Sequence, residues 1–190
     1  MLLDLFSWLA REHSFFNVFS YISIRAVLAI ITALIVSFVL GPWFIKKLGD
    51  YSFGQYVRTD GIEAHIIKTG TPTMGGGLIL IAILFSTLLW ADLSNRYIWL
   101  LIVVTITFAL IGLVDDYSKI KNKKSDGLSA LHKYGLQSFV GFSVATYILL
   151  TATTPESTEL LIPFLKDASI PLGATGFILL AYIVIVGSSN

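Results

Sequence analysis

Cysteine is absent from this 190-residue chain, and charged residues are scarce. Without cysteine the protein can form no disulfide, no thiolate metal site and no cysteine nucleophile. Charged residues make up 13% of the chain, whereas an average soluble protein contains about 25%. The 13 basic and 12 acidic residues nearly cancel to a formal net charge of +1, so no overall field favours nucleic acid or another polyanionic partner.

Hydrophobic residues account for 55% of the sequence. A soluble domain of this length cannot cover so much apolar surface, and a disordered chain is poor in such residues. The composition therefore predicts an all-α, polytopic transmembrane helical bundle in the lipid bilayer, forming a single membrane domain over 1–190.

Five segments approach the length of a membrane span, because a lipid core about 30 Å thick requires roughly 20 apolar residues in a helix. The predicted spans are 21–40, 75–93, 97–114, 134–152 and 172–187. The fourth is the most polar and the fifth is the shortest. Pro42 and the Gly49 region are expected to mark the end of the first span. An amphipathic surface helix is expected within 1–19, and a small hairpin within 153–171.

Basic residues are unevenly distributed between the predicted loops. Loops 41–74 and 115–133 together contain nine, whereas the segments on the opposite side contain three. Because basic loops remain in the cytoplasm, this asymmetry places both long loops inside and the N-terminus outside. Arg25 lies near the start of the first span, and its side chain is expected to extend back to the interface.

Asp115 and Asp116 follow the apolar run Ile-Gly-Leu-Val at the end of the third span. Adjacent carboxylates at a membrane boundary repel each other and are costly to bury. One could bind Mg²⁺, which prefers oxygen ligands, while the other acts as a base or nucleophile. The alternative is a solvated helix end without function. On a regular helix neighbouring side chains point about 100° apart, so we expect them to share one ion only if the helix end unwinds.

The segment 68–77, Lys-Thr-Gly-Thr-Pro-Thr-Met-Gly-Gly-Gly, precedes the second span. A lysine, hydroxyls and glycines at a helix N-terminus indicate an anion site, although the spacing is not that of a Walker loop. The glycines are equally compatible with close helix packing. The lysines after the aspartate pair fit either positive-inside topology or a magnesium–diphosphate substrate. The three histidines show no metal-ligand spacing.

Four segments together resemble a known enzyme family. They are NVFSYISIRAVLAIITAL, GQYVRTDGIEAHIIKTGTPTMGG, IGLVDDYSKI and AYIVIVGSSN. In register along essentially the whole chain, they resemble the N-terminal half of the phospho-N-acetylmuramoyl-pentapeptide-transferases, the translocase I family. The resemblance implies ten transmembrane helices, about five of them here, in the bacterial cytoplasmic membrane. It also implies Mg²⁺-dependent transfer of phospho-MurNAc-pentapeptide from UDP-MurNAc-pentapeptide to undecaprenyl phosphate, which gives lipid I and UMP for peptidoglycan biosynthesis.

The resemblance also implies roles for individual residues. Asp115 and Asp116 match the family's aspartate pair, with catalytic and metal-binding roles. The implied substrate-binding residues are Lys68, Thr73, Lys119, Lys133 and Asn190. The family's later metal-binding aspartate and the second half of its bundle lie beyond the matched part, so we expect the chain alone to be inactive and its longer parent to be the transferase. A homodimer is left open.

Alternatives of two kinds remain. A related polyprenyl-phosphate N-acetylhexosamine-1-phosphate transferase would use the same aspartates and lysines. A transporter half or a non-catalytic membrane subunit would belong to another class, but transporters place charges at mid-span, and these spans contain almost none besides Arg25. For the transferase, direct attack by the lipid phosphate is favoured over an aspartyl-phosphate intermediate.

Overall fold

The computed structural model describes residues 2–51, 74–122, 127–154, 158–162 and 169–189. The chain divides into two compact units, 1–127 and 128–190. In the described part of the first unit, the elements are α1 (Leu2–Leu9), the 3-10 helix η1 (Ser14–Ser20), α2 (Ile22–Tyr51), α3 (Gly76–Trp90) and α4 (Arg96–Asn122). In that of the second, they are α5 (Ala130–Leu150), β1 (Glu159–Leu161), β2 (Ser169–Pro171) and α6 (Gly173–Ser188). The predicted, predominantly helical architecture is confirmed.

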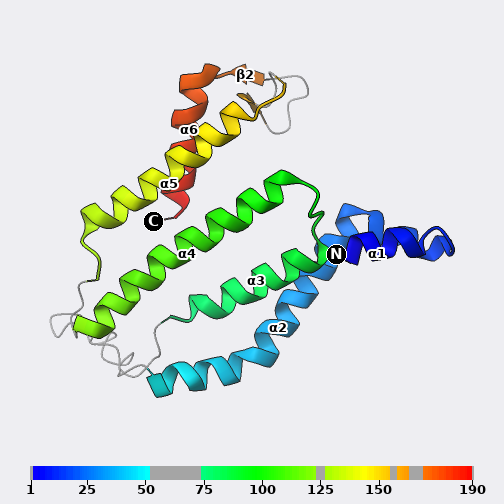
Figure 1. Ribbon diagram of the computed structural model, residues 1–190, viewed down its shortest axis with the longest axis horizontal. Helices are drawn as coiled ribbons and strands as arrows, with labels where there is room; N and C mark the ends of the chain where they lie inside the picture. Colours follow the sequence, from blue (N-terminus) through cyan, green and yellow to red (C-terminus); the bar gives the residue numbers. More distant parts are fainter. Residues whose placement is uncertain (1, 52–73, 123–126, 155–157, 163–168, 190) are drawn as a thin grey trace. The chain divides into compact units, whose positions relative to one another are not determined.

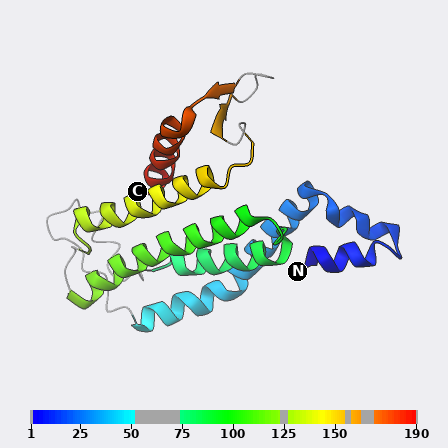
Figure 2. The same cartoon turned by 45° about the horizontal axis from the view of Figure 1, so that its top comes forward.

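Helices α2, α3 and α4 lie side by side, each antiparallel to the next (Figures 1 and 2). The small residues Ala82 and Ser86 on α3 are buried, and small side chains allow helices to approach closely. The Trp90 indole Nε1 donates to Thr32 Oγ1 at 2.9 Å and joins the end of α3 to α2. Packing of small residues and this hydrogen bond therefore fix the central helix pair.

An aromatic cluster joins the N-terminal segment to the end of α3. The ring of Phe6 stacks on Phe19, with centroids 4.1 Å apart, and on Trp90 at 6.1 Å. Offset aromatic pairs of this kind stabilise a fold by about 0.5–1.5 kcal/mol each, in addition to the stabilisation from burying their apolar surface. The helix predicted within 1–19 is present as α1, and Phe6 on its apolar face attaches it to α3.

Helix α2 continues past Pro42 and ends at Tyr51, close to Gly49. The helix is bent along its length in Figure 1. A proline inside a helix removes one hydrogen-bond donor, and its ring clashes with the preceding turn, so it kinks the helix. Pro42 therefore bends α2 without ending it, and the helix ends two residues after Gly49.

Two helices are long and apolar enough to cross a membrane, Ile22–Asp50 and Arg96–Lys121. In the first of these helices, none of the most apolar 18-residue stretch is buried, and in the second, 11% of that stretch is buried. The core helix of a soluble protein would instead be mostly buried. Phe38 on α2 is 77% exposed, which suits contact with lipid tails. Length and exposure together indicate a membrane protein.

The other three predicted spans do not meet the same criterion. Helices α3 and α6 are apolar but contain 15 and 16 residues, which at 1.5 Å per residue reach about 22–24 Å. Helix α5 has 21 residues but is the most polar of the predicted spans. The five-span arrangement therefore stays a prediction.

In the second unit, α5 and α6 pack against each other and are joined by hydroxyl groups. The Tyr182 hydroxyl lies 2.7 Å from that of Tyr134 and 3.0 Å from Ser138 Oγ. The ring of Phe142 stacks on Tyr182 at 4.2 Å. Ala145 is completely buried. The hydroxyl cluster and the packing of small residues together stabilise this helix pair.

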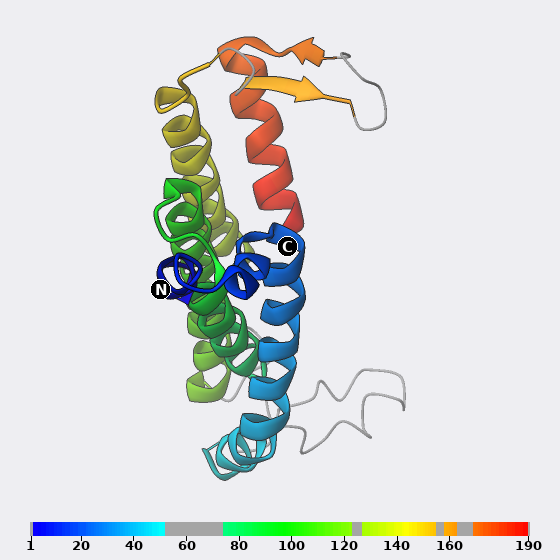
Figure 3. The ribbon, with the colours of Figure 1, turned by 90° about the vertical axis from the view of Figure 1, so that its right-hand side faces the viewer.

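Strands β1 and β2 form an antiparallel hairpin between α5 and α6, with Leu160 opposite Ile170 (Figure 3). The hairpin predicted within 153–171 is confirmed. Its three-residue strands are short, and so few backbone pairs give little stability on their own.

Gly141→Ala is expected to destabilise the α5–α6 pair by about 1–3 kcal/mol through overpacking, because an added Cβ would lie 2.8 Å from Val186 Cγ2. Gly135→Ala on the same helix is the matched control, since nothing lies within 4 Å of its added Cβ. That control should stabilise the helix by roughly 0.5–1 kcal/mol. Thermal unfolding in lipid nanodiscs, followed by circular dichroism, measures both changes. Equal stability of the two variants would contradict the packing described.

Candidate functional site

An ion-pair cluster occupies the last turns of α4. Lys119 Nζ lies 2.7 Å from Asp115 Oδ2 and 3.3 Å from Asp116 Oδ1. Lys119 follows Asp115 by four residues and Asp116 by three. Residues three and four positions apart lie on the same face of a helix, so the Lys119 side chain reaches both aspartates. One ammonium therefore bonds to both carboxylates.

The helix end remains regular at this cluster. Helix α4 continues past the apolar segment 97–114 to Asn122, so the two aspartates lie within it rather than in a loop. The helix end does not unwind, so the sharing of one metal ion by the adjacent carboxylates stays a prediction; what they share in the structure is the ammonium of Lys119. The lysine side chain is long enough to bridge the angle between them.

Burial differs between the two carboxylates. The Asp115 side chain is 11% exposed, whereas that of Asp116 is 35% exposed and that of Lys119 is 39% exposed. A buried charge is tolerated when it is paired, which accounts for the shorter contact of Lys119 with Asp115. The cluster carries two negative charges and one positive charge, so it retains a net affinity for a cation at its more exposed member, Asp116.

Gly127 packs directly against Asp115. A Cβ added at Gly127 would overlap the Asp115 carboxylate and lie 2.8 Å from its backbone oxygen. Any larger residue would displace the chain from the aspartate, so this position requires glycine. The close approach brings the chain that follows α4 back onto the ion-pair cluster.

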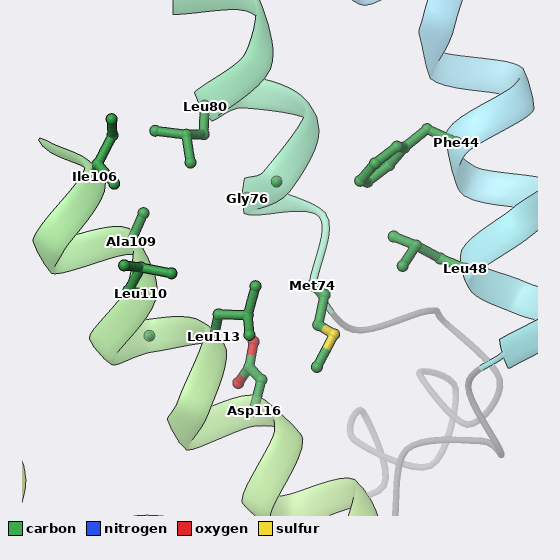
Figure 4. Close-up of a pocket in the computed structure, with 12 residues that line it drawn as sticks. Phe44, Leu48, Met74, Gly76, Leu80, Ile106, Ala109, Leu110, Leu113 and Asp116 are labelled. Carbon is green, nitrogen blue, oxygen red and sulfur yellow. The ribbon is translucent and has the colours of Figure 1, made fainter. Parts of the chain in front are cut away.

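An apolar cavity of about 420 Å³ opens beside the cluster, between the end of α2, the start of α3 and the second half of α4 (Figure 4). Asp116 is the charged residue of its lining. The apolar lining residues labelled in the figure are Phe44, Leu48, Met74, Gly76, Leu80, Ile106, Ala109, Leu110 and Leu113. In Figure 4 the Asp116 carboxylate lies beside Leu113, at one end of the cavity. Such a shape accommodates a ligand with an apolar body and a polar end.

The backbone at the start of α3 has an unusual conformation. Met74 has a φ of 71°, a left-handed value that is uncommon for a residue with a side chain and costs of order 1–3 kcal/mol. Three residues on, a Cβ at Gly77 would lie 3.1 Å from the Phe44 ring. The glycine lets Phe44 approach, and Met74 turns the chain into the cavity wall.

The predicted site residues fall into three groups. Asp115, Asp116 and Lys119 are brought together as described. Lys133 lies in the first turn of α5, in the second unit. Lys68, Thr73 and Asn190 lie outside the described residues.

The donor set fits part of a magnesium site. No group of three or more histidine or acidic residues able to bind a metal occurs among the described residues. Mg²⁺ is commonly bound through one or two carboxylates together with waters and substrate phosphates. Asp116 with Asp115 fits that pattern, because both are carboxylates and their cluster carries a net negative charge.

Sequence reasoning did not identify Gly127 or Phe44, and it placed Met74 in the predicted anion site at 68–77 without indicating its conformation. The signal available at Gly127 was an Asp-Gly dipeptide after the basic stretch, which indicates a turn but not a contact with Asp115. Met74 and Phe44 carry no such signal, because their roles depend on how α2, α3 and α4 pack.

No protein-family model matches the chain.

Lys119→Met is expected to destabilise the first unit by about 1–3 kcal/mol, because the largely buried Asp115 carboxylate would lose its ammonium partner. Lys121→Met, an exposed residue on the same helix, is the matched control and should change stability little. The double variant Asp115→Asn, Lys119→Met should recover part of the loss. Denaturant unfolding of each variant in nanodiscs measures these differences, and equal stability of the two single variants would contradict the buried pairing.

Proposed function

We propose that this chain supplies the aspartate site and the acceptor-lipid site of a phospho-N-acetylmuramoyl-pentapeptide-transferase. The reaction transfers phospho-MurNAc-pentapeptide from UDP-MurNAc-pentapeptide to undecaprenyl phosphate, giving lipid I and UMP. The observation that carries the proposal is the Asp115–Asp116–Lys119 cluster, whose more exposed carboxylate stands at one end of an apolar cavity.

The acceptor matches the cavity in its chemistry. Undecaprenyl phosphate combines a long apolar chain with a terminal phosphate. The apolar walls formed by α2, α3 and α4 suit the first carbons of the chain, and burial of such carbons contributes about 0.8 kcal/mol per methylene. Asp116, in the cavity lining, then faces the phosphate as a proton acceptor, and Lys119, which bonds to Asp116, provides a positive charge beside it.

Each residue of the cluster has a distinct part in the proposed reaction. Asp116 accepts the remaining proton of the lipid phosphate. A lipid phosphate oxygen then forms a bond to the phosphorus attached to the sugar, and the bond from that phosphorus to the UMP oxygen breaks, so UMP leaves as an anion. Lys119 orients both carboxylates and offsets negative charge, while Asp115, the more buried acid, fixes Lys119.

Magnesium is the expected cofactor, and Asp116 with Asp115 would bind it. Phosphoryl transfer depends mainly on positioning and charge neutralisation, and the bound ion would neutralise the pyrophosphate. The lysine-rich end of α4 supports a cytoplasmic location for the site under the positive-inside rule, in the bacterial cytoplasmic membrane.

The absence of charge at mid-span favours an enzyme over a transporter half. Across 22–40, 76–90, 97–114 and 173–188, Arg25 is the only charged residue, whereas a transport pathway places ionisable groups within the membrane. A transferase for other UDP-N-acetylhexosamines would use the same cluster, so the sugar donor must be tested directly.

Asp116→Asn is expected to reduce transfer by about 10²–10⁴-fold, because the amide cannot accept the proton. The assay follows UMP release and lipid I formation from UDP-MurNAc-pentapeptide, undecaprenyl phosphate and Mg²⁺. It uses membranes that contain the longer parent expected from the resemblance, and the 190-residue chain in parallel, for which no transfer is expected. Glu12→Gln, a change at an exposed carboxylate in the N-terminal segment, is the control and should retain full activity.

Two outcomes of this assay would overturn the proposal. Near-normal turnover by Asp116→Asn would remove the assigned proton acceptor. Release of UMP with UDP-N-acetylglucosamine, and none with the muramoyl pentapeptide, would assign the other transferase. UMP release in the absence of lipid acceptor would instead favour an aspartyl-phosphate intermediate.

A further inference from the structure

A second cavity, of about 390 Å³, lies in the first unit where α2 begins, α3 ends and α4 begins. Its lining residue Ile98 and the aspartate pair stand at opposite ends of α4, about 25 Å apart at 1.5 Å per residue. The proposed transfer uses none of its residues. The cavity therefore requires an explanation of its own.

Arg25 lines this cavity, and the hydrogen-bonding capacity of its guanidinium is not fully satisfied. Its Nε atom is buried, and it is the only such side-chain polar atom without a hydrogen-bond partner in the described part of the chain. A guanidinium has five N–H donors in a fixed planar arrangement and accepts no hydrogen bond. It can therefore be satisfied only by an acceptor, and phosphate oxygens match its geometry.

Asp92 supplies the opposite charge in the same cavity. Its Oδ1 accepts hydrogen bonds from the Ser94 hydroxyl at 2.6 Å and from the Ser94 backbone N–H at 3.0 Å. These two bonds, and the positive charge of Arg25, hold the pKa of the Asp92 carboxyl below its usual value. Asp92 is thus ionised at neutral pH, and its second oxygen can accept from a cation.

The remaining walls combine apolar and polar surface. Ile22, Ala26 and Ala29 come from α2, and Trp90 and Ile98 come from α3 and α4. Trp90 is held in place by its hydrogen bond to Thr32. Because the two alanines are small, an alkyl chain could lie against α2 within this cavity without displacing a large side chain.

We propose that this cavity binds one phospholipid with a zwitterionic headgroup, of the phosphoethanolamine type. The phosphate accepts from Arg25, the ammonium donates to Asp92, and the first part of an acyl chain lies along Ala26 and Ala29. An anionic lipid such as phosphatidylglycerol has no ammonium to offer the Asp92 carboxylate, and a free phosphate would leave the apolar wall uncovered. Charge complementarity and the apolar wall therefore select the same ligand.

Lipid titration of the purified 190-residue chain, followed by native mass spectrometry, tests the site. The wild-type chain should retain one phosphatidylethanolamine in preference to phosphatidylglycerol. Arg25→Gln should weaken retention of phosphatidylethanolamine by about tenfold or more, the value expected for loss of a charge-assisted hydrogen bond. Asp92→Asn should abolish the preference between the two lipids while binding is kept.

Two further variants distinguish lipid binding at this cavity from general effects of charge and folding. Arg96→Gln removes one charge at the same end of the helices but outside the cavity lining, where Arg96 stacks on Tyr97 at 5.0 Å, and it should bind like the wild type. Ala29→Leu places a larger side chain in the cavity wall without changing charge. It should also reduce retention of phosphatidylethanolamine, which keeps the test decisive if Arg25→Gln does not fold.

Three results would overturn the proposal. One is unchanged phosphatidylethanolamine retention in both Arg25→Gln and Ala29→Leu. Another is equal retention of phosphatidylglycerol by the wild-type chain. The third is competition by soluble phosphoethanolamine as strong as that by the lipid, which would show that the apolar wall contributes nothing. None of them bears on the proposed transfer, whose assay depends on Asp116.

Discussion

The contact of Lys119 with Asp115 and Asp116 is the interaction on which the candidate site depends. Two adjacent carboxylates at the end of an apolar helix repel each other, and Asp115 is largely removed from water. A single ammonium one turn later compensates both. With that pairing α4 stays helical to Asn122, and the acidic pair is presented on a rigid element beside the cavity.

The lipid environment explains where the charges of the first unit lie. Large apolar side chains on α2, such as Phe38 and Val39, remain exposed, which is stable only in an apolar surrounding. Charged residues of α2 and α4 consequently lie toward the helix ends, and the two cavities described above occur at opposite ends of α4. One combines apolar walls with a net negative cluster, and the other combines them with the oppositely charged pair Arg25 and Asp92. This difference in charge is the basis on which we propose different lipid ligands for the two cavities.

Much of the fold followed from hydropathy, because apolar runs and helix periodicity are properties of local sequence. The helices within 21–40, 75–93, 97–114, 134–152 and 172–187 all exist, and so do the N-terminal helix and the hairpin. Their ends were less predictable. The apolar run ends at Val114, but α4 continues to Asn122 because Lys119 pairs with the two aspartates that follow Val114. Hydropathy suggested 75–93, but α3 ends at Trp90, ahead of the turn in which Ser94 bonds to Asp92.

The candidate site was predictable only in part. The sequence pointed to Asp115, Asp116 and Lys119, because three charges after an apolar run are conspicuous. It could not indicate that Gly127 lies against Asp115, that Met74 adopts a left-handed conformation, or that Phe44 lines a cavity with Asp116. These relations depend on packing between segments distant in sequence, on which local propensity and composition give no information.

Photolabelling of the cavity is the most direct test of the central claim, that the space ending at Asp116 binds a polyprenyl phosphate. A diazirine analogue of undecaprenyl phosphate would be bound to the purified chain, irradiated, and its attachment sites mapped by peptide mass spectrometry. The account predicts labelling at the start of α3 and within residues 106–113 of α4, suppressed by unlabelled undecaprenyl phosphate. Labelling spread over the outward faces of α2 and α5, and insensitive to competitor, would contradict it.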